Sequence, residues 1–167
     1  MRNLCSSILR SWGTTARPNL WQYAWILSMF GLLAALEWNR LGLFLVPPFG
    51  ATLTLLLVLP EASVTQPWPV IAGSVAGSTT GTLLALFAHG SAMAIAAAVL
   101  AFAAMNLIRA YHPPGVALAM YPLLLRPGHW FPLAVVFPFT LAAVGSAALL
   151  SRFVSVWPPY PKPLDDA

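Results

Sequence analysis

The chain has 167 residues, of which 59% are hydrophobic and only 7% carry a charge, with a net charge of +4. A soluble globular domain has roughly 25% charged residues, so this composition excludes a water-facing surface and predicts an integral membrane protein surrounded by lipid. The eight Lys and Arg residues are scattered along the chain, which excludes the clustered basic patch that nucleic acid requires.

The first 19 residues form a separate segment, in which three arginines lie among apolar residues at rough helical spacing. This pattern is typical of a basic helix at a membrane interface, and plain disorder is the alternative. The first long apolar run begins at Leu20. It is too long for the core of a signal peptide, so we expect it to be retained.

Four long apolar stretches approach the roughly 20 residues that a helix needs to cross about 30 Å of hydrocarbon. Charged or turn-forming residues flank each stretch. The sequence therefore predicts long membrane helices over residues 20–36, 70–88, 92–108 and 131–150.

Two shorter apolar stretches, residues 49–59 and 115–125, each follow a pair of prolines. A stretch of this length makes only about 16 Å of helix, which is half the thickness of a bilayer. Proline suits the first turn of a helix and forces the preceding residue into an extended conformation. We therefore expect Val46 and His112 to be extended. Irregular backbone at membrane depth needs a cavity or a polar neighbour to satisfy it.

The two halves of the chain, about residues 20–88 and 89–152, repeat one order of features. Each has an apolar helix, a proline pair, a short apolar stretch, an aromatic-proline step and a long apolar stretch. We interpret this as an internal duplication. The predicted fold is all-α: a polytopic helical membrane protein of two tandem repeats, each with two long helices and one short proline-broken helix. Residues 153–167 form a C-terminal tail.

Two membrane topologies are compatible with these six segments. If all six segments cross the membrane, the halves are inverted, whereas two re-entrant short segments would make the halves parallel. The distribution of Lys and Arg in the loops slightly favours six crossings.

The third segment carries a glycine at every fourth position, with a stripe of hydroxyl residues beside it. Such a small-xxx-small face lets another helix approach closely. The hydroxyls either line a polar path or bond to their own helix backbone. The glycines are Gly73, Gly77 and Gly81, and the hydroxyl residues are Ser74, Ser78 and Thr82.

The proline pairs are the candidate site for a small anion, because a helix N-terminus offers free N–H groups and a partial positive charge. Corresponding broken helices in two halves also indicate where a transporter binds its substrate. The alternative for His112 is that it satisfies a backbone group at the break. The candidate residues are His112, Pro113, Pro114, Gly115 and Asn106 in the second half and Pro47, Pro48, Gly50, Thr52 and Thr54 in the first.

Other classes of site lack a sequence signal. There is no acid pair at useful spacing, no phosphate loop and no pair of metal ligands, since His89 and His129 stand at unrelated positions. We expect no enzyme, no metal and no cofactor.

The run His112-Pro113-Pro114-Gly115, together with Pro47-Pro48-Phe49-Gly50-Ala51 and the step Gln66-Pro67, resembles the HPP family of integral membrane proteins over roughly residues 20–152. Some plant plastid and cyanobacterial members of that family are implicated in nitrite transport. The resemblance implies a transport role, with nitrite as a candidate, and carries His112, Pro113 and Pro114 over as site residues. Val116 and Trp68 depart from the family pattern, which commonly has a small residue and a basic residue there.

The first functional hypothesis is a multi-pass transporter or channel-like carrier for a small inorganic anion, in a bacterial inner membrane. The glycine face also fits a structural or regulatory membrane subunit without transport activity. A third hypothesis is an intramembrane enzyme with His112 as acid or base. A chain this small encloses little volume, which is compatible with a homo-oligomer.

Overall fold

The computed structural model describes residues 18–37 and 45–162. The predicted basic segment of residues 1–19 lies outside the described residues except for its last two. Within the described ranges the regular structure is helical and contains no strand, which confirms the all-α prediction. The helices are α2 (Leu20–Glu37), α3 (Pro47–Val58), α4 (Ser74–Leu84), α5 (Ser91–Leu107), α6 (Pro113–Leu125) and α7 (Phe137–Phe153), with short turns η1 (Ser63–Thr65), η2 (Pro69–Gly73) and η3 (Pro132–Val136).

The two aromatic-proline steps each begin a long helix with a π-helical turn. The π turn η2 runs directly into α4, and η3 runs directly into α7. In the second case the local cause is Pro138, which has no N–H for the carbonyl of Ala134, four residues earlier. The regular α-helical hydrogen bonds are interrupted at Pro138, and the wider π-helical turn η3 lies directly before it.

One helix in the described part of the chain, Pro132–Phe153 with 22 residues, is long and apolar enough to cross a membrane on its own. Four other apolar helices are shorter, at 10–17 residues. The outward faces carry large apolar side chains, and Leu27, Leu107, Leu133 and Phe153 are all more than half exposed. A surface of this kind suits a lipid surrounding rather than water.

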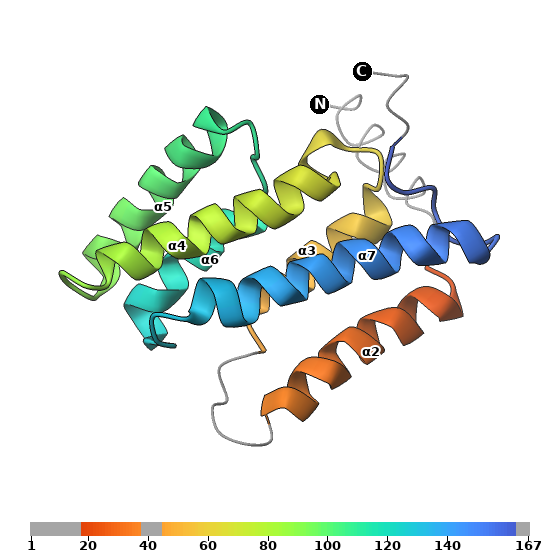
Figure 1. Cartoon of the computed structure of the whole chain (residues 1–167), viewed down its shortest axis with the longest axis horizontal. Coiled ribbons are helices and arrows are strands. Elements are labelled where there is room, and N and C mark those ends of the chain that lie inside the picture. Colours follow the sequence, from red (N-terminus) through yellow and green to blue (C-terminus); the bar gives the residue numbers. More distant parts are fainter. Residues whose placement is uncertain (1–17, 38–44, 163–167) are drawn as a thin grey trace, which may run out of the picture.

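Successive helices run in opposite directions, so every second helix shares one direction. In Figure 1, α2 and α4 both run from right to left, whereas α7 runs from left to right beside α4. Helices α4 and α6 are parallel, because Gly77 of α4 meets Gly115 of α6 and, four residues later in each helix, Gly81 meets Ala119.

Two apolar clusters hold the helices together. One joins α2, α3, α7 and the segment after α7, where Phe49 stacks on Phe139 at 3.8 Å between ring centroids and Trp25 packs edge-on against Trp157. The other joins α4, α5 and α6 through small residues such as Ala97. The described residues after α7, 154–162, thus belong to the packed structure, since Trp157 is 5% exposed.

Candidate functional site

Both proline pairs begin a helix, and the residue before each pair is extended, as predicted. Val46 before α3 has φ −78° and ψ 121°, and His112 before α6 has φ −133° and ψ 111°. The prolines fix the first helical turn and forbid a helical conformation in the residue that precedes them. The sequence thus determines where α3 and α6 start.

The first three residues of each helix lack the free N–H groups that we expected there, and for these residues the prediction is wrong. The first two positions of each helix are prolines, which have no N–H. The third N–H is already used, because Phe49 donates to the Val46 carbonyl and Gly115 donates to the His112 carbonyl, both at 2.9 Å. The first three residues of each helix therefore offer no free N–H group, and we look to side chains for donors.

His112 supplies the polar group at the second break, and it is completely buried. Its Nδ1 lies 2.8 Å from the carbonyl oxygen of Val64, and its Nε2 lies 3.0 Å from Oγ1 of Thr52. A carbonyl can only accept a hydrogen bond, so Nδ1 carries a proton and donates it to Val64. The imidazole thereby joins the start of α6 to α3 and to the turn η1.

The hydroxyl of Thr52 completes this cluster. Its Oγ1 is also 3.2 Å from the carbonyl oxygen of Pro48 in its own helix. With a neutral imidazole, the hydroxyl donates to Nε2 of His112. With a doubly protonated ring it accepts from Nε2 and donates to Pro48, so the cluster accommodates both protonation states.

The remaining predicted residues divide into two sets. Thr54 and Asn106 are exposed and donate to carbonyls of their own helices, so neither side chain joins the His112–Thr52 cluster. Pro114 and Gly115 are buried at the start of α6. Pro47 and Pro113 are exposed, and Pro48 and Gly50 are half-buried.

The glycine face, formed by the last residue of η2 and two residues of α4, lies directly against the backbone of α6 and the residues before it. A Cβ at Gly73 would collide with the Ala110 carbonyl, and one at Gly77 would collide with the Gly115 carbonyl. At Gly81 the obstacle is the carbonyl of Ala119. This contact presses α4 against the segment that carries His112.

The hydroxyl residues of α4 are buried, but only some of their hydroxyl groups have a hydrogen-bond partner. Ser78 donates to the carbonyl of Ser74 at 2.9 Å. The side-chain oxygens of Ser74 and Thr82 are buried and have no hydrogen-bond partner among the described residues. A buried hydroxyl without a partner is costly, so each marks a place where a ligand or water would be stabilised.

The C-terminal segment holds the turn that contacts His112. Tyr160 donates its hydroxyl to the carbonyl of Thr65 at 2.9 Å, and the backbone N–H of Lys162 donates to Gln66. Burial raises the pKa of Tyr160, which therefore remains a neutral donor. Sequence reasoning missed this connection, and its only signal was an aromatic residue in the segment named as a C-terminal tail.

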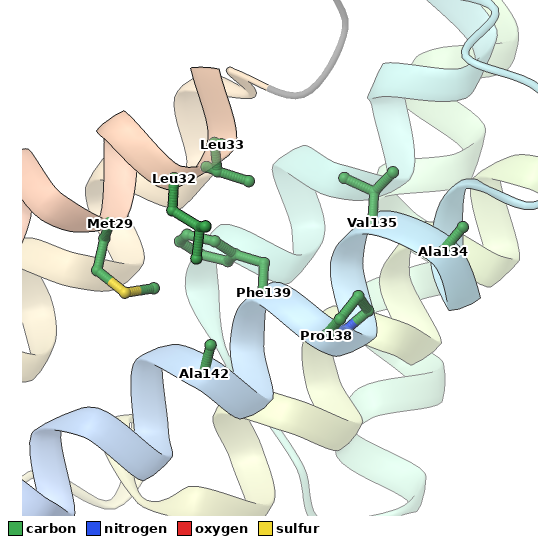
Figure 2. A pocket seen from close by; sticks show the side chains of 8 residues that line it. All are labelled: Met29, Leu32, Leu33, Ala134, Val135, Pro138, Phe139 and Ala142. Carbon is green, nitrogen blue, oxygen red and sulfur yellow. The ribbon is translucent and has the colours of Figure 1, made fainter. Parts of the chain in front are cut away.

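A cavity of about 270 Å³ lies between α2 and the beginning of the last helix. Figure 2 shows its lining, in which side chains of α2 face side chains of η3 and α7. The lining side chains are apolar throughout, so this cavity offers no donor to an anion. They are Met29, Leu32, Leu33, Ala134, Val135, Pro138, Phe139 and Ala142. Across residues 18–37 and 45–162, no three His, Cys, Asp or Glu side chains gather as a metal ion would require.

Comparisons with known proteins give one match. The family model described as "HPP, transmembrane region" matches residues 14–161. No curated protein matches the chain, and no solved structure does.

Proposed function

The chain belongs to the HPP transmembrane family, and from this premise we propose that it transports a small inorganic anion, with nitrite as the first candidate. The single observation that carries the proposal is the buried pair of His112 and Thr52, which links two proline-broken helices. Broken helices that meet inside a membrane protein are the usual setting of a transporter's substrate site. No covalent chemistry is proposed.

The pair offers two donors to an anion. The Nδ1–H of His112 and the hydroxyl of Thr52 would replace the backbone N–H groups that the prolines remove, while the partial positive charge of the helix starts remains. In this structure the Nδ1–H donates to the carbonyl of Val64 in the turn η1. Displacement of that turn would free the donor for the substrate.

The same geometry supports coupling to protons. An imidazolium inside a protein needs a compensating negative charge, so His112 would take up its second proton together with the anion. The hydroxyl of Thr52 then accepts from the protonated Nε2 and has its own proton available for the anion, in place of the carbonyl of Pro48 that lies 3.2 Å away. This arrangement would carry one proton with each anion, which is an electroneutral step.

The directions of the helices support six crossings and inverted halves. Helices α2, α4 and α6 share one direction and α7 has the other, as alternating crossings require. Re-entrant short helices would instead set α2 and α4 in opposite directions. We therefore propose a multi-pass membrane protein in which the two repeats meet at His112 and Thr52, and we keep a bacterial inner membrane as its proposed location.

The hydroxyl stripe of α4 is the proposed path away from this pair. Ser74 follows Gly73, which touches the His112 segment, and Thr82 lies near the other end of α4. Residues four apart on a helix are about 6 Å apart along its axis. A small anion could therefore pass between successive hydroxyls without losing all its hydrogen bonds.

Nitrite uptake into liposomes that contain the purified protein tests the proposal. The assay runs at alkaline pH with protein-free vesicles as the baseline, because nitrous acid crosses bilayers unaided. Wild type should take up nitrite above the baseline, and His112→Ala and Thr52→Val should not. Thr54→Val is the matched control, because its hydroxyl is exposed and bonds only to its own helix.

The alternative is a structural or regulatory membrane subunit, and the close glycine contact of α4 with α6 favours it. In that case folded wild-type protein would show no uptake above protein-free vesicles for nitrite, nitrate or other small anions. A partner protein would instead be recovered reproducibly with it from native membranes. That pair of results would make the proline pairs architectural features alone.

A further inference from the structure

A polar cavity lies at the far end of α4 and α6 from His112. It has a volume of about 120 Å³ and is lined by Thr82, Pro122, Arg126, Gly128 and the two histidines His89 and His129. We call it the Arg126 cavity. Its lining comes from the ends of α4 and α6 and from the loops that follow them, which lie toward the left of Figure 1.

The Arg126 cavity contains the donors that an anion needs. Arg126 carries a fixed positive charge and five N–H donors. Each histidine ring carries at least one N–H in either neutral form. No acidic side chain stands among the described lining residues.

Thr82 is the second, independent sign of a ligand. The residue lines the cavity and is only 8% exposed, and its buried hydroxyl has no hydrogen-bond partner among the described residues. An unpaired buried hydroxyl costs free energy that a bound acceptor would recover. An oxyanion offers such an acceptor to Thr82 and to Arg126 together.

The backbone holds these groups in place. Arg126 has φ +53° and ends α6 in the left-handed conformation, and Gly128 has φ +96°. The loop that carries His89 is tied to α6 because the N–H of Gly90 donates to the carbonyl of Leu123. The helical residues of the lining belong to the C-terminal ends of α4 and α6, whose dipoles place a partial negative charge here. The positive charge of Arg126 must offset this partial charge for an anion to bind.

We propose that the Arg126 cavity binds a small inorganic oxyanion such as nitrite or nitrate. The volume corresponds to about four water molecules at about 30 Å³ each, which suits a small anion with part of its hydration shell. Along α6 the cavity is roughly 20 Å from His112, with the hydroxyl stripe of α4 between them. This inference rests on the proposed function. In it, the Arg126 cavity is the site where the anion binds before it enters the path along α4.

The direct test measures binding in detergent, where no transport is needed. Nitrite and nitrate are titrated against the thermal unfolding of purified wild type, Arg126→Asn and Arg109→Asn. Both arginines are exposed and have a left-handed backbone, which asparagine tolerates, so Arg109→Asn is the matched control for charge and strain. We expect about ten-fold weaker apparent affinity for Arg126→Asn, as loss of a charged hydrogen bond predicts, and no change for Arg109→Asn. Equal titrations of all three proteins would overturn the inference.

Thr82→Val gives a second variant that retains the charge of Arg126. It should weaken anion binding in the same assay without loss of fold, because valine needs no hydrogen bond. An unchanged titration would count against the assignment of Thr82.

The same chemistry could be presented by the phosphate of an anionic lipid. Native mass spectrometry after purification distinguishes the two sources. A phosphatidylglycerol molecule that is retained by wild type, lost in Arg126→Asn and not displaced by nitrite would overturn the free-anion proposal in favour of the headgroup.

Uptake into liposomes separates this inference from the proposed function. If both hold, Arg126→Asn raises KM for nitrite about ten-fold at similar maximal rate. If the protein binds nitrite through Arg126 in detergent but transports nothing, the inference stands and the proposed function fails.

Discussion

The Nε2 of His112 lies 3.0 Å from Oγ1 of Thr52, although the two residues are 60 positions apart in the chain. Each residue belongs to one of the two proline-broken segments, so this contact joins the halves of the sequence. Both side chains are completely buried. The pair is therefore placed where loss of one hydrogen bond should affect stability and, under the proposed function, transport.

Thr52→Val should destabilise the protein by about 1–3 kcal/mol, because Nε2 of His112 would remain buried without a partner. Thermal unfolding in detergent measures the effect, and Thr54→Val serves as the control. Thr54 bonds only to carbonyls of its own helix and is exposed, so its substitution should change little. Equal unfolding temperatures for the two variants would contradict the role of the Thr52 hydroxyl.

Gly77→Ala should be strongly destabilising, because the added methyl group would meet the carbonyl of Gly115 across the contact of α4 with α6. Overpacking of this kind costs about 1–3 kcal/mol or more when backbone must move. Gly145→Ala is the matched control. Its Cβ would meet nothing within 4 Å, and replacement of a helical glycine should even stabilise by about 0.5–1 kcal/mol. Chemical unfolding of the two variants should shift in opposite directions.

Helix α2 should depend on a hydrogen bond to α7. The indole N–H of Trp25 donates to Oγ of Ser146 at 2.9 Å. Ser146→Ala should cost about 1 kcal/mol and speed up hydrogen exchange along α2. Ser28→Ala should leave both quantities unchanged, because the Ser28 hydroxyl is exposed and donates to Ala24 in its own helix.

The helix starts could be predicted because proline acts locally. Its ring determines the conformation of its own residue and of the one before, so Val46 and His112 were identifiable without tertiary information. The glycine face was also visible, since a small residue at every fourth position leaves room for a neighbouring backbone. Thr52 was visible as a hydroxyl shortly after the first break.

The partners of these residues could not be predicted. Val64 contacts His112 through its main-chain carbonyl, and a carbonyl has no signature in residue type. The contact of Tyr160 with Thr65 spans 95 positions, and no local pattern determines such a pairing. The prediction of free N–H groups failed for a chemical reason, because the same prolines that begin α3 and α6 remove those donors.

Tyr160→Phe should loosen the turn that holds His112. The variant removes one buried hydrogen bond, from the Tyr160 hydroxyl to the carbonyl of Thr65, and should cost about 0.5–1.5 kcal/mol. Hydrogen exchange over residues 63–66 should become faster. Tyr23→Phe is the control, because Tyr23 is 57% exposed. Unchanged exchange in Tyr160→Phe would mean that the C-terminal segment does not hold the turn.

Stability should also fall at alkaline pH in a manner that depends on Tyr160. Burial raises the pKa of this phenol in the folded protein, whereas the unfolded chain loses the proton near pH 10. Above that pH the folded state binds more protons than the unfolded state, so the free energy of unfolding falls as pH rises. Tyr160→Phe should remove this component and unfold with a shallower alkaline dependence than wild type or Tyr23→Phe. Parallel alkaline profiles for all three proteins would show that the phenol is not protected by the fold.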